Sequence, residues 1–145
     1  MTISIKIVGL RAHDDALRKI ESAAKTNVDR AVLLGGEDLR SEIVRRIQRG
    51  SRSGRVYKRG SRTHQASAPG EYPKSDSGRL ASHVFMRRVE PAVAEVGTAV
   101  VHGRPLEEGT SKMAPRPWLN RTFDDLKPRI VARIRRAIAA SLRTK

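Results

Sequence analysis

The chain begins with a short alternating segment. In Thr2–Val8 the isoleucines Ile3, Ile5 and Ile7 are separated by polar residues. Alternation with a period of two is typical of a strand that buries one face. The sequence therefore predicts a half-buried strand that ends at Gly9.

A helical pattern follows from about Ala12 to Gln48. The apolar positions recur every three or four residues, at Leu17, Ile20, Ala24, Val28, Ala31, Leu34 or Gly35, Leu39, Ile43 and Ile47. This spacing predicts one long amphipathic helix that ends at Gly50. Two glycines in a helix cost roughly 2 kcal/mol relative to alanines. We therefore expect a kink or a break at Gly35–Gly36.

The segment from Ser51 to Ser77 shows no apolar periodicity. A connection of this length is unusual in a small domain and is typically functional or disordered. We expect an extended loop at about 50–77 that projects from the core and gains order against a partner. Asp76 or Ser77 is expected to cap a short helical turn at Gly78–Ser82.

The second half of the chain predicts a hairpin and a helix. His83–Val89 and Ala92–Val101 are rich in valine and flank Glu90–Pro91, which indicates two antiparallel strands. A turn is expected at Glu107–Thr110, and Pro117 suits the first position of a helix. The apolar stripe of that helix consists of Phe123, Leu126, Ile130, Ile134, Ile138 and Leu142, and Pro128 within it predicts a kink or a fresh start.

These elements predict a single α+β domain over residues 1–145. A small antiparallel sheet of about three or four strands would be packed by the long N-terminal helix and the C-terminal helix, with the long loop projecting. The chain has 145 residues, no cysteine and no apolar run long enough to span a bilayer. We expect a protein that works without disulfides and has no membrane partner.

The net charge of +15 is concentrated in two segments, residues 45–64 and residues 116–145. Residues 1–44 and 65–115 are each neutral overall, whereas residues 45–64 have no acidic side chain. Such a field attracts polyanions such as nucleic acid, or an acidic protein surface; a merely solvated surface is the other interpretation. The candidate contacts for DNA or an acidic partner are Arg45, Arg46, Arg49, Arg52, Arg55, Lys58, Arg59 and Arg62.

Catalytic chemistry finds little support in the sequence. His64 and Ser67 are close along the chain, but their spacing in a Pro/Gly-rich loop implies no catalytic geometry and no orienting carboxylate. No two histidines have the helical spacing of metal ligands. We expect no enzyme activity, no catalytic residue, no metal and no cofactor. The few aromatic residues also argue against a module that reads single-stranded bases.

Two strings of residues then stand out. The first contains His64, Ala66, Ser67, Pro69, Gly70, Pro73, Asp76, Ser77, Gly78 and Leu80. The second contains Glu108, Gly109, Thr110, Met113, Arg116, Pro117, Trp118 and Leu119. In this order, on either side of a predicted hairpin, they resemble the neck or tail-completion proteins of long-tailed bacteriophages, a family that includes the lambdoid minor tail protein Z group.

The resemblance implies a structural virion protein that joins the DNA-filled head to the tail and surrounds the DNA exit channel. It implies a homo-oligomeric ring, a hexamer in preference to a dodecamer. Its neighbours would be the connector or stopper and the tail terminator or tube, with genomic DNA passing close by. The protein would be assembled in the bacterial host cytoplasm and reside in the virion neck or tail.

The resemblance also assigns roles to the two strings. The first would be an assembly loop, and the second would be a further assembly motif with Trp118 as a core or interface anchor. Two alternatives remain open at this stage: a basic DNA-binding protein without enzymatic activity, and a small hydrolase or toxin that depends on His64.

Overall fold

The computed structural model describes residues 10–143, so the strand predicted at Thr2–Val8 lies outside the described residues. Helices and two small antiparallel sheets confirm the α+β class. The elements in chain order are α1 (Leu10–Arg49), β1 (Val56–Arg59), β2 (Arg62–Gln65), α2 (Arg79–Ser82), β3 (Val84–Glu90), β4 (Val93–Thr98), α3 (Gly103–Glu108) and α4 (Asn120–Ser141).

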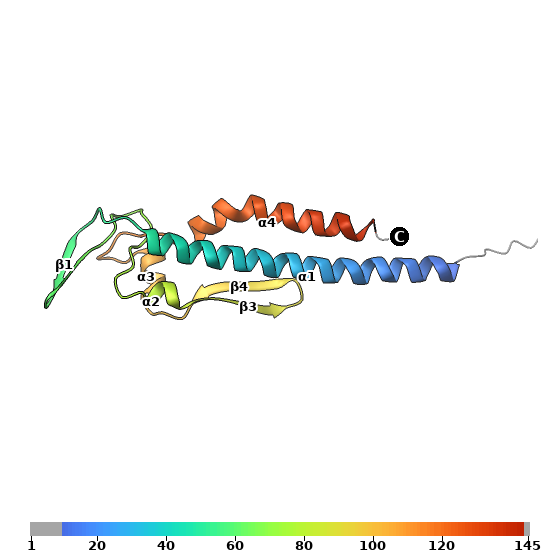
Figure 1. Cartoon of the computed structure of the whole chain (residues 1–145), viewed down its shortest axis with the longest axis horizontal. Helices are drawn as coiled ribbons and strands as arrows, with labels where there is room; N and C mark the ends of the chain where they lie inside the picture. The colour runs from blue at the N-terminus through green and yellow to red at the C-terminus, as the bar shows by residue number, and fades with distance from the viewer. Residues whose placement is uncertain (1–9, 144–145) are drawn as a thin grey trace, which may run out of the picture.

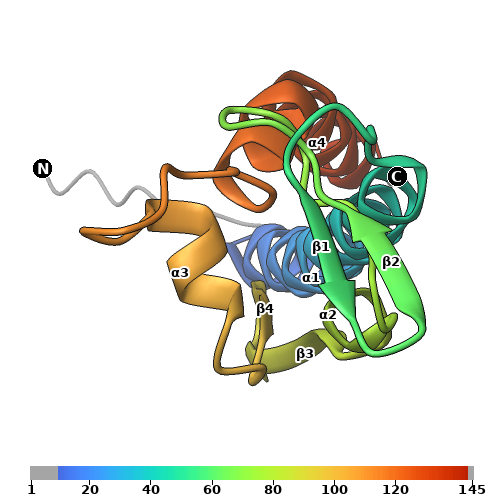
Figure 2. The ribbon, with the colours of Figure 1, turned by 90° about the vertical axis from the view of Figure 1, so that its left-hand side faces the viewer.

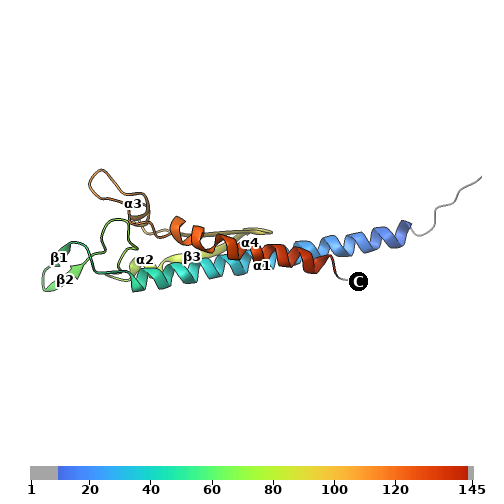
Figure 3. The same ribbon diagram turned by 90° about the horizontal axis from the view of Figure 1, so that it is seen from above.

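The fold is an elongated three-layer arrangement around α1. This helix has 40 residues and is therefore about 60 Å long. Helix α4 runs antiparallel along one side of α1, and the β3–β4 hairpin covers the opposite side (Figure 1, Figure 2). The view from above shows that the first turns of α1 extend beyond both of these layers (Figure 3).

Polar contacts fix the antiparallel register of α1 and α4. Arg46 pairs with Asp125 near one end, and Asp38 accepts a hydrogen bond from Arg133 at 2.7 Å in the middle. Towards the far end, the Asn27 amide donates to the Ser141 hydroxyl at 2.9 Å. The residue numbers fall along α1 as they rise along α4, so the chain returns along its own first helix.

The predicted break at Gly35–Gly36 is wrong, because α1 runs through both residues. A Cβ at Gly35 would lie 3.1 Å from Ile130 of α4, and a Cβ at Gly36 would lie 3.0 Å from Met86 of β3. The glycines thus allow the two outer layers to approach the helix closely. Packing on both sides outweighs their low helix propensity.

The predicted hairpin at residues 83–101 is confirmed with slightly shorter strands. β3 and β4 pair in antiparallel register, for example Met86 with Val96, and the turn lies at Pro91–Ala92. The expected sheet of three or four strands is instead two separate hairpins, because β1 pairs only with β2 and β3 only with β4 in the described part of the chain.

The expected loop at 50–77 contains structure of its own. β1 and β2 form a hairpin around Gly60, which has a positive φ of 60°. This hairpin projects from the end of the molecule, beyond the last turn of α1 (Figure 1). Its strands carry mostly polar and charged residues, so no apolar pattern announces them.

The C-terminal helix begins later than predicted. α4 starts at Asn120, so Pro117 precedes the helix rather than occupying its first position. The helix also continues through Pro128 as one element, and the predicted fresh start there is wrong. A short helix, α3, occupies Gly103–Glu108, where the sequence indicated only a strand end and a turn.

The buried core lies at the C-terminal third of α1. Seven buried side chains form one cluster in which α1, α2, β3 and the segment before α4 meet: Leu39, Ile43, Ile47, Leu80, Ala81, Val84 and Trp118. The opposite end of α1 contributes none of them. The protein therefore has one well-packed end, and the β1–β2 hairpin projects from that end.

Candidate assembly site

The two strings singled out in the sequence come together in space. The Gly70 amide donates to the Pro115 carbonyl at 2.9 Å, and Arg116 Nε donates to the Ser67 carbonyl at 3.0 Å. Arg121 at the start of α4 donates to the Gly70 carbonyl at 3.0 Å. We call this contact between residues 66–80 and 103–119 the junction.

The junction changes the expectation for the first string. Residues 66–80 do not project; they lie against the second string and the core, and Leu80 is buried. The segment that projects is the β1–β2 hairpin with its flanking residues 52–55, which we call the basic arm (Figure 1). The predicted projecting loop is thus shorter and lies earlier in the chain.

The basic arm is attached to the junction by backbone contacts. The Gly54 amide donates to the Ala66 carbonyl at 2.8 Å, and the Ala66 amide donates to the Arg55 carbonyl at 3.0 Å. A Cβ at Gly54 would lie 2.3 Å from the Ser67 carbonyl oxygen. Only glycine allows this approach, which fixes the base of the arm.

A second anchor involves Glu71, a residue outside the predicted set. Its carboxylate accepts hydrogen bonds from the hydroxyls of Ser51 and Ser53 and from the Ala68 amide. The Ser51 hydroxyl, with Ser53 and then the Ala68 amide, lowers the pKa of Glu71. This carboxylate therefore ties the segment after α1 to the first string.

Tyr72 links the first string to α1 and α4 and was also missed. Two guanidinium groups contact its ring: Arg46 at 5.1 Å and Arg121 at 5.0 Å from the centroid. Its hydroxyl accepts a hydrogen bond from Arg46 and lies 3.5 Å from the Thr122 hydroxyl. One aromatic side chain thus connects α1, the first string and α4. Tyr72 follows Pro69 and Gly70 and precedes Pro73, so no apolar periodicity marked it in the sequence.

The second string is organised by Glu107 and Trp118. The Glu107 carboxylate accepts hydrogen bonds from the backbone amides of Trp118, Leu119 and Asn120 at 2.7 to 2.9 Å. These are unpaired amides at the start of α4, where a negative charge is favourable. Trp118 is 3% exposed and donates from Nε1 to the Gly103 carbonyl at 3.0 Å. It is therefore a core anchor within the subunit.

The other predicted residues of the second string shape its turns. Gly109 ends α3 with a φ of 80°, and a Cβ there would lie 2.9 Å from the Met113 carbonyl oxygen. Thr110 and Met113 form an isolated bridge. Glu108 points away from the junction and pairs with Arg104.

The first string contributes turn residues as well. Gly70 and Gly78 both have a positive φ, which glycine adopts without strain. Gly78 takes the N-cap position of α2 without a side-chain cap, and the Arg79 amide lies 3.5 Å from the Ser77 hydroxyl. Pro69 is exposed, whereas Pro73 is buried beneath the arm.

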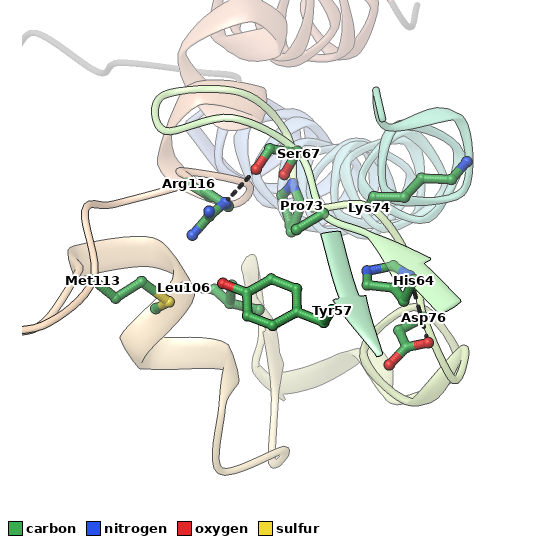
Figure 4. A pocket seen from close by; sticks show the side chains of 10 residues that line it. Tyr57, His64, Ser67, Pro73, Lys74, Asp76, Leu106, Met113 and Arg116 are labelled. Carbon is green, nitrogen blue, oxygen red and sulfur yellow. Dashed lines mark hydrogen bonds and ion pairs between the residues drawn. The ribbon is translucent and has the colours of Figure 1, made fainter. Parts of the chain in front are cut away.

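A hollow of about 210 Å³ lies between the basic arm and the junction (Figure 4). Its walls combine apolar groups with charged groups of both signs. They consist of Tyr57, His64, Ala66, Ser67, Pro73, Lys74, Asp76, Leu106, Met113 and Arg116. His64 Nδ1 lies 3.4 Å from Asp76 Oδ1.

The carboxylate beside His64 corrects the sequence interpretation, which found no orienting partner for this histidine. β2 and the turn before α2 bring His64 and Asp76 together across the chain. The Ser67 hydroxyl is buried and has no hydrogen-bond partner in the described part of the chain. The imidazole–hydroxyl hydrogen bond that activates a serine nucleophile is therefore absent.

The basic segment divides into two groups of different character. Arg45 and Arg46 belong to α1 and both pair with Glu42, while Arg46 also pairs with Asp125. The Arg45 guanidinium, together with Arg46, lowers the pKa of Glu42 to about 2 against the effect of burial. Burial alone would lower the pKa of Arg46, but its hydrogen bonds to Asp125, Glu42 and Tyr72 raise it. Both arginines are thus paired with carboxylates of the same chain.

The second group lies on the basic arm. Arg52, Arg55, Lys58 and Arg62 are exposed, and none of them has an ion pair within the described part of the chain. Arg55 lies over the ring of Tyr57 at 5.6 Å. Arg59 belongs to β1, where its backbone pairs with Arg62, and Arg49 is exposed at the end of α1. Four exposed cations without an ion pair among the described contacts therefore lie on the basic arm.

Two further features bear on the kind of site. No helix among residues 10–143 is long and apolar enough to cross a membrane. Within the same residues, no group of three or more metal-ligating side chains gathers in one place. Comparisons of the chain with protein families, with curated proteins and with solved structures find no match.

Proposed function

We propose that the protein is a structural subunit of the bacteriophage head–tail interface, a neck or tail-completion ring protein. The observation that supports the proposal best is the junction. The two strings that resemble this family are separated by a hairpin in the chain, yet they pack together through the contacts of Gly70, Pro115 and Arg116. The two strings would occur together in one sequence because their residues form one packed structure, the junction.

The shape of the subunit also supports an assembly role. Its core lies at one end, the basic arm projects beyond that end, and α1 extends past the other layers at the opposite end (Figure 1). Subunits of a closed ring contact their neighbours head to tail through two different surfaces. An elongated chain with a projecting segment at either end is suited to such contacts.

The charge of the arm suits a position beside DNA or an acidic neighbour. Cyclic symmetry would repeat the cations of Arg52, Arg55, Lys58 and Arg62 around the ring. In this proposal the ring is homo-oligomeric, a hexamer in preference to a dodecamer. It lies in the virion neck between connector or stopper and tail, and it has no enzymatic role.

The decisive experiment removes the gene from a phage or inducible prophage that carries it. We expect filled heads and separate tails to accumulate unjoined, and purified protein to restore joining in the extract. Electron microscopy counts the joined particles. Normal yields of joined virions from the deletion strain would refute the proposal.

A second candidate function is that of a basic DNA-binding protein. The unpaired cations of the arm are the observation that favours it. Binding of this type depends steeply on salt, with a slope of about 0.9 per phosphate contacted. Tight, salt-sensitive DNA binding by the isolated protein, together with normal virion assembly in the deletion strain, would support this alternative over the neck protein.

A further inference from the structure

An apolar groove lies along α1, between α4 and β4. Its walls come from α1, α4 and β4, and its volume is about 310 Å³. Ligand sites in proteins begin at roughly 300 Å³, so the groove can take several side chains. Apart from Asn120 its lining is apolar or glycine: Val32, Gly35, Gly36, Leu39, Ala94, Val96, Leu119, Phe123, Ile130 and Ile134.

The groove borders a free strand edge. β4 contributes Ala94 and Val96 to its lining, whereas β3 contributes no residue. β4 pairs with β3 on one side and with no other strand among the described residues. Figure 2 shows the β3–β4 hairpin on one side of α1 and α4 on the other. An edge strand beside an apolar groove is a template for one more strand.

We propose that this groove receives the segment Ile3–Ile7 of a second copy of the chain, which adds to β4 as a third strand. The segment alternates isoleucine with serine and lysine, so a strand built from it has one apolar face. That face would cover Val32, Phe123 and Ile134, and its backbone would use the free groups of β4.

The reach of the chain requires the donor to be another copy. Ile5 precedes Leu10, the first residue of α1, by five positions, which span at most about 18 Å. The nearest helix residue of the groove, Val32, lies 22 positions into α1, or about 33 Å from Leu10. The segment cannot reach its own groove along this unbroken helix.

This contact deepens the proposed function, since it supplies the head-to-tail contact that a ring needs. The N-terminal end of α1 lies at the opposite end of the molecule from the core (Figure 1). A donor at that end and an acceptor groove beside the core are two different surfaces, so the contact can propagate from copy to copy.

The test uses a nine-residue peptide, Met1–Gly9, and the full chain carrying Ile3→Lys, Ile5→Lys and Ile7→Lys as acceptor. These substitutions disable the acceptor's own donor segment and leave the groove unchanged. Isothermal titration calorimetry measures peptide binding, and amide hydrogen exchange measures protection in residues 93–98. We expect saturable binding together with slower exchange in β4. A peptide with serine at the three isoleucine positions should not bind.

A matched pair of acceptor variants locates the site. Phe123 is 41% exposed and lines the groove, whereas Leu34 is 50% exposed and does not. Phe123→Lys should weaken binding at least about tenfold, equivalent to 1.4 kcal/mol, and Leu34→Lys should leave it unchanged. If Phe123→Lys disturbs the fold by circular dichroism, the β4 protection in the unchanged groove remains decisive.

Three results would overturn the inference: no binding at millimolar peptide, equal binding of the serine peptide, or protection that falls outside β4. None of them bears on head–tail joining, which is scored on particles. Failure of the strand contact and failure of the proposed function are therefore distinguishable.

Discussion

Glu107 caps the helix that follows Trp118: its Oε2 accepts the Trp118 amide at 2.7 Å across eleven residues of chain. The same carboxylate also accepts hydrogen bonds from the backbone amides of Leu119 and Asn120. It belongs to α3, so the cap connects two helices rather than ending one. The position of α4 on α1 thus depends on a residue outside α4.

Replacing this cap should destabilise the protein measurably. Glu107→Ala leaves three amides without a partner, and we expect a loss of about 1–2 kcal/mol in the free energy of unfolding. Urea denaturation followed by circular dichroism measures it. Glu108→Ala is the control, because Glu108 is exposed and pairs only with Arg104 in the described contacts, and it should change stability by less than about 0.5 kcal/mol. Equal effects of both variants would contradict the role of the cap.

Gly103 offers a test of close packing at the start of α3. A Cβ at this position would lie 2.5 Å from Thr98 Cγ2. Gly103→Ala should therefore cost about 1–3 kcal/mol, measured by thermal unfolding. Thr98→Ser removes the clashing methyl but retains the hydroxyl that accepts the Val100 amide. The double variant should recover most of the loss; no recovery would show that the clash is elsewhere.

The Glu42 carboxylate predicts a stability change in acid. Its folded pKa of about 2 lies below the ordinary value of 4.5. The contribution of ionised Glu42 to the free energy of unfolding is therefore complete above pH 4.5, and it is lost as the pH falls from 4.5 towards 2. A fall of the pKa from 4.5 to about 2 corresponds to about 3–4 kcal/mol. Solvent screening at the half-exposed Arg45 reduces this contribution to about 2–3 kcal/mol.

Glu42→Gln should lower stability at neutral pH and flatten this part of the acid profile, measured by denaturation between pH 2 and pH 7. The matched control is Glu21→Gln, which alters an exposed pair with Lys25. Its effect on the profile should be small. A Glu42→Gln profile as steep as that of the unchanged protein would rule out Glu42 as the source.

The basic arm should dominate binding to polyanions. Glutamine at Arg52, Arg55, Lys58 and Arg62 should weaken retention on heparin or DNA and reduce its salt dependence, without loss of stability, because these side chains are exposed. The control removes the same number of charges from the C-terminal segment, at Lys127, Arg135, Arg136 and Arg143, which are exposed and have no ion pair among the described contacts. Equal losses would mean that net charge, rather than the arm, determines binding.

The elements with long apolar stripes could be predicted from the sequence. The stripe from Leu17 to Ile47 indicated α1, and the valines on either side of Glu90–Pro91 indicated the β3–β4 hairpin. The Gly35–Gly36 break was wrong because local propensity does not include the packing of Ile130 and Met86 on those glycines.

The strands of the basic arm and the side-chain contacts around the junction could not be predicted, for different reasons. Six of the eight residues of β1 and β2 are polar or charged, so the strands carry no alternating apolar pattern. Glu71, Tyr72 and Glu107 act through contacts made only after distant segments meet. The pairing of His64 with Asp76 likewise needs β2 and the turn before α2 to fold together.

The single indole of the chain has a consequence for fluorescence measurements on this protein. Trp118 is buried where the two strings meet, with its N–H bonded to the Gly103 carbonyl. Any rearrangement that opens the junction would bring water to this ring and shift its fluorescence to longer wavelength. The wavelength of Trp118 fluorescence therefore reports whether the junction is closed or open, without an added label.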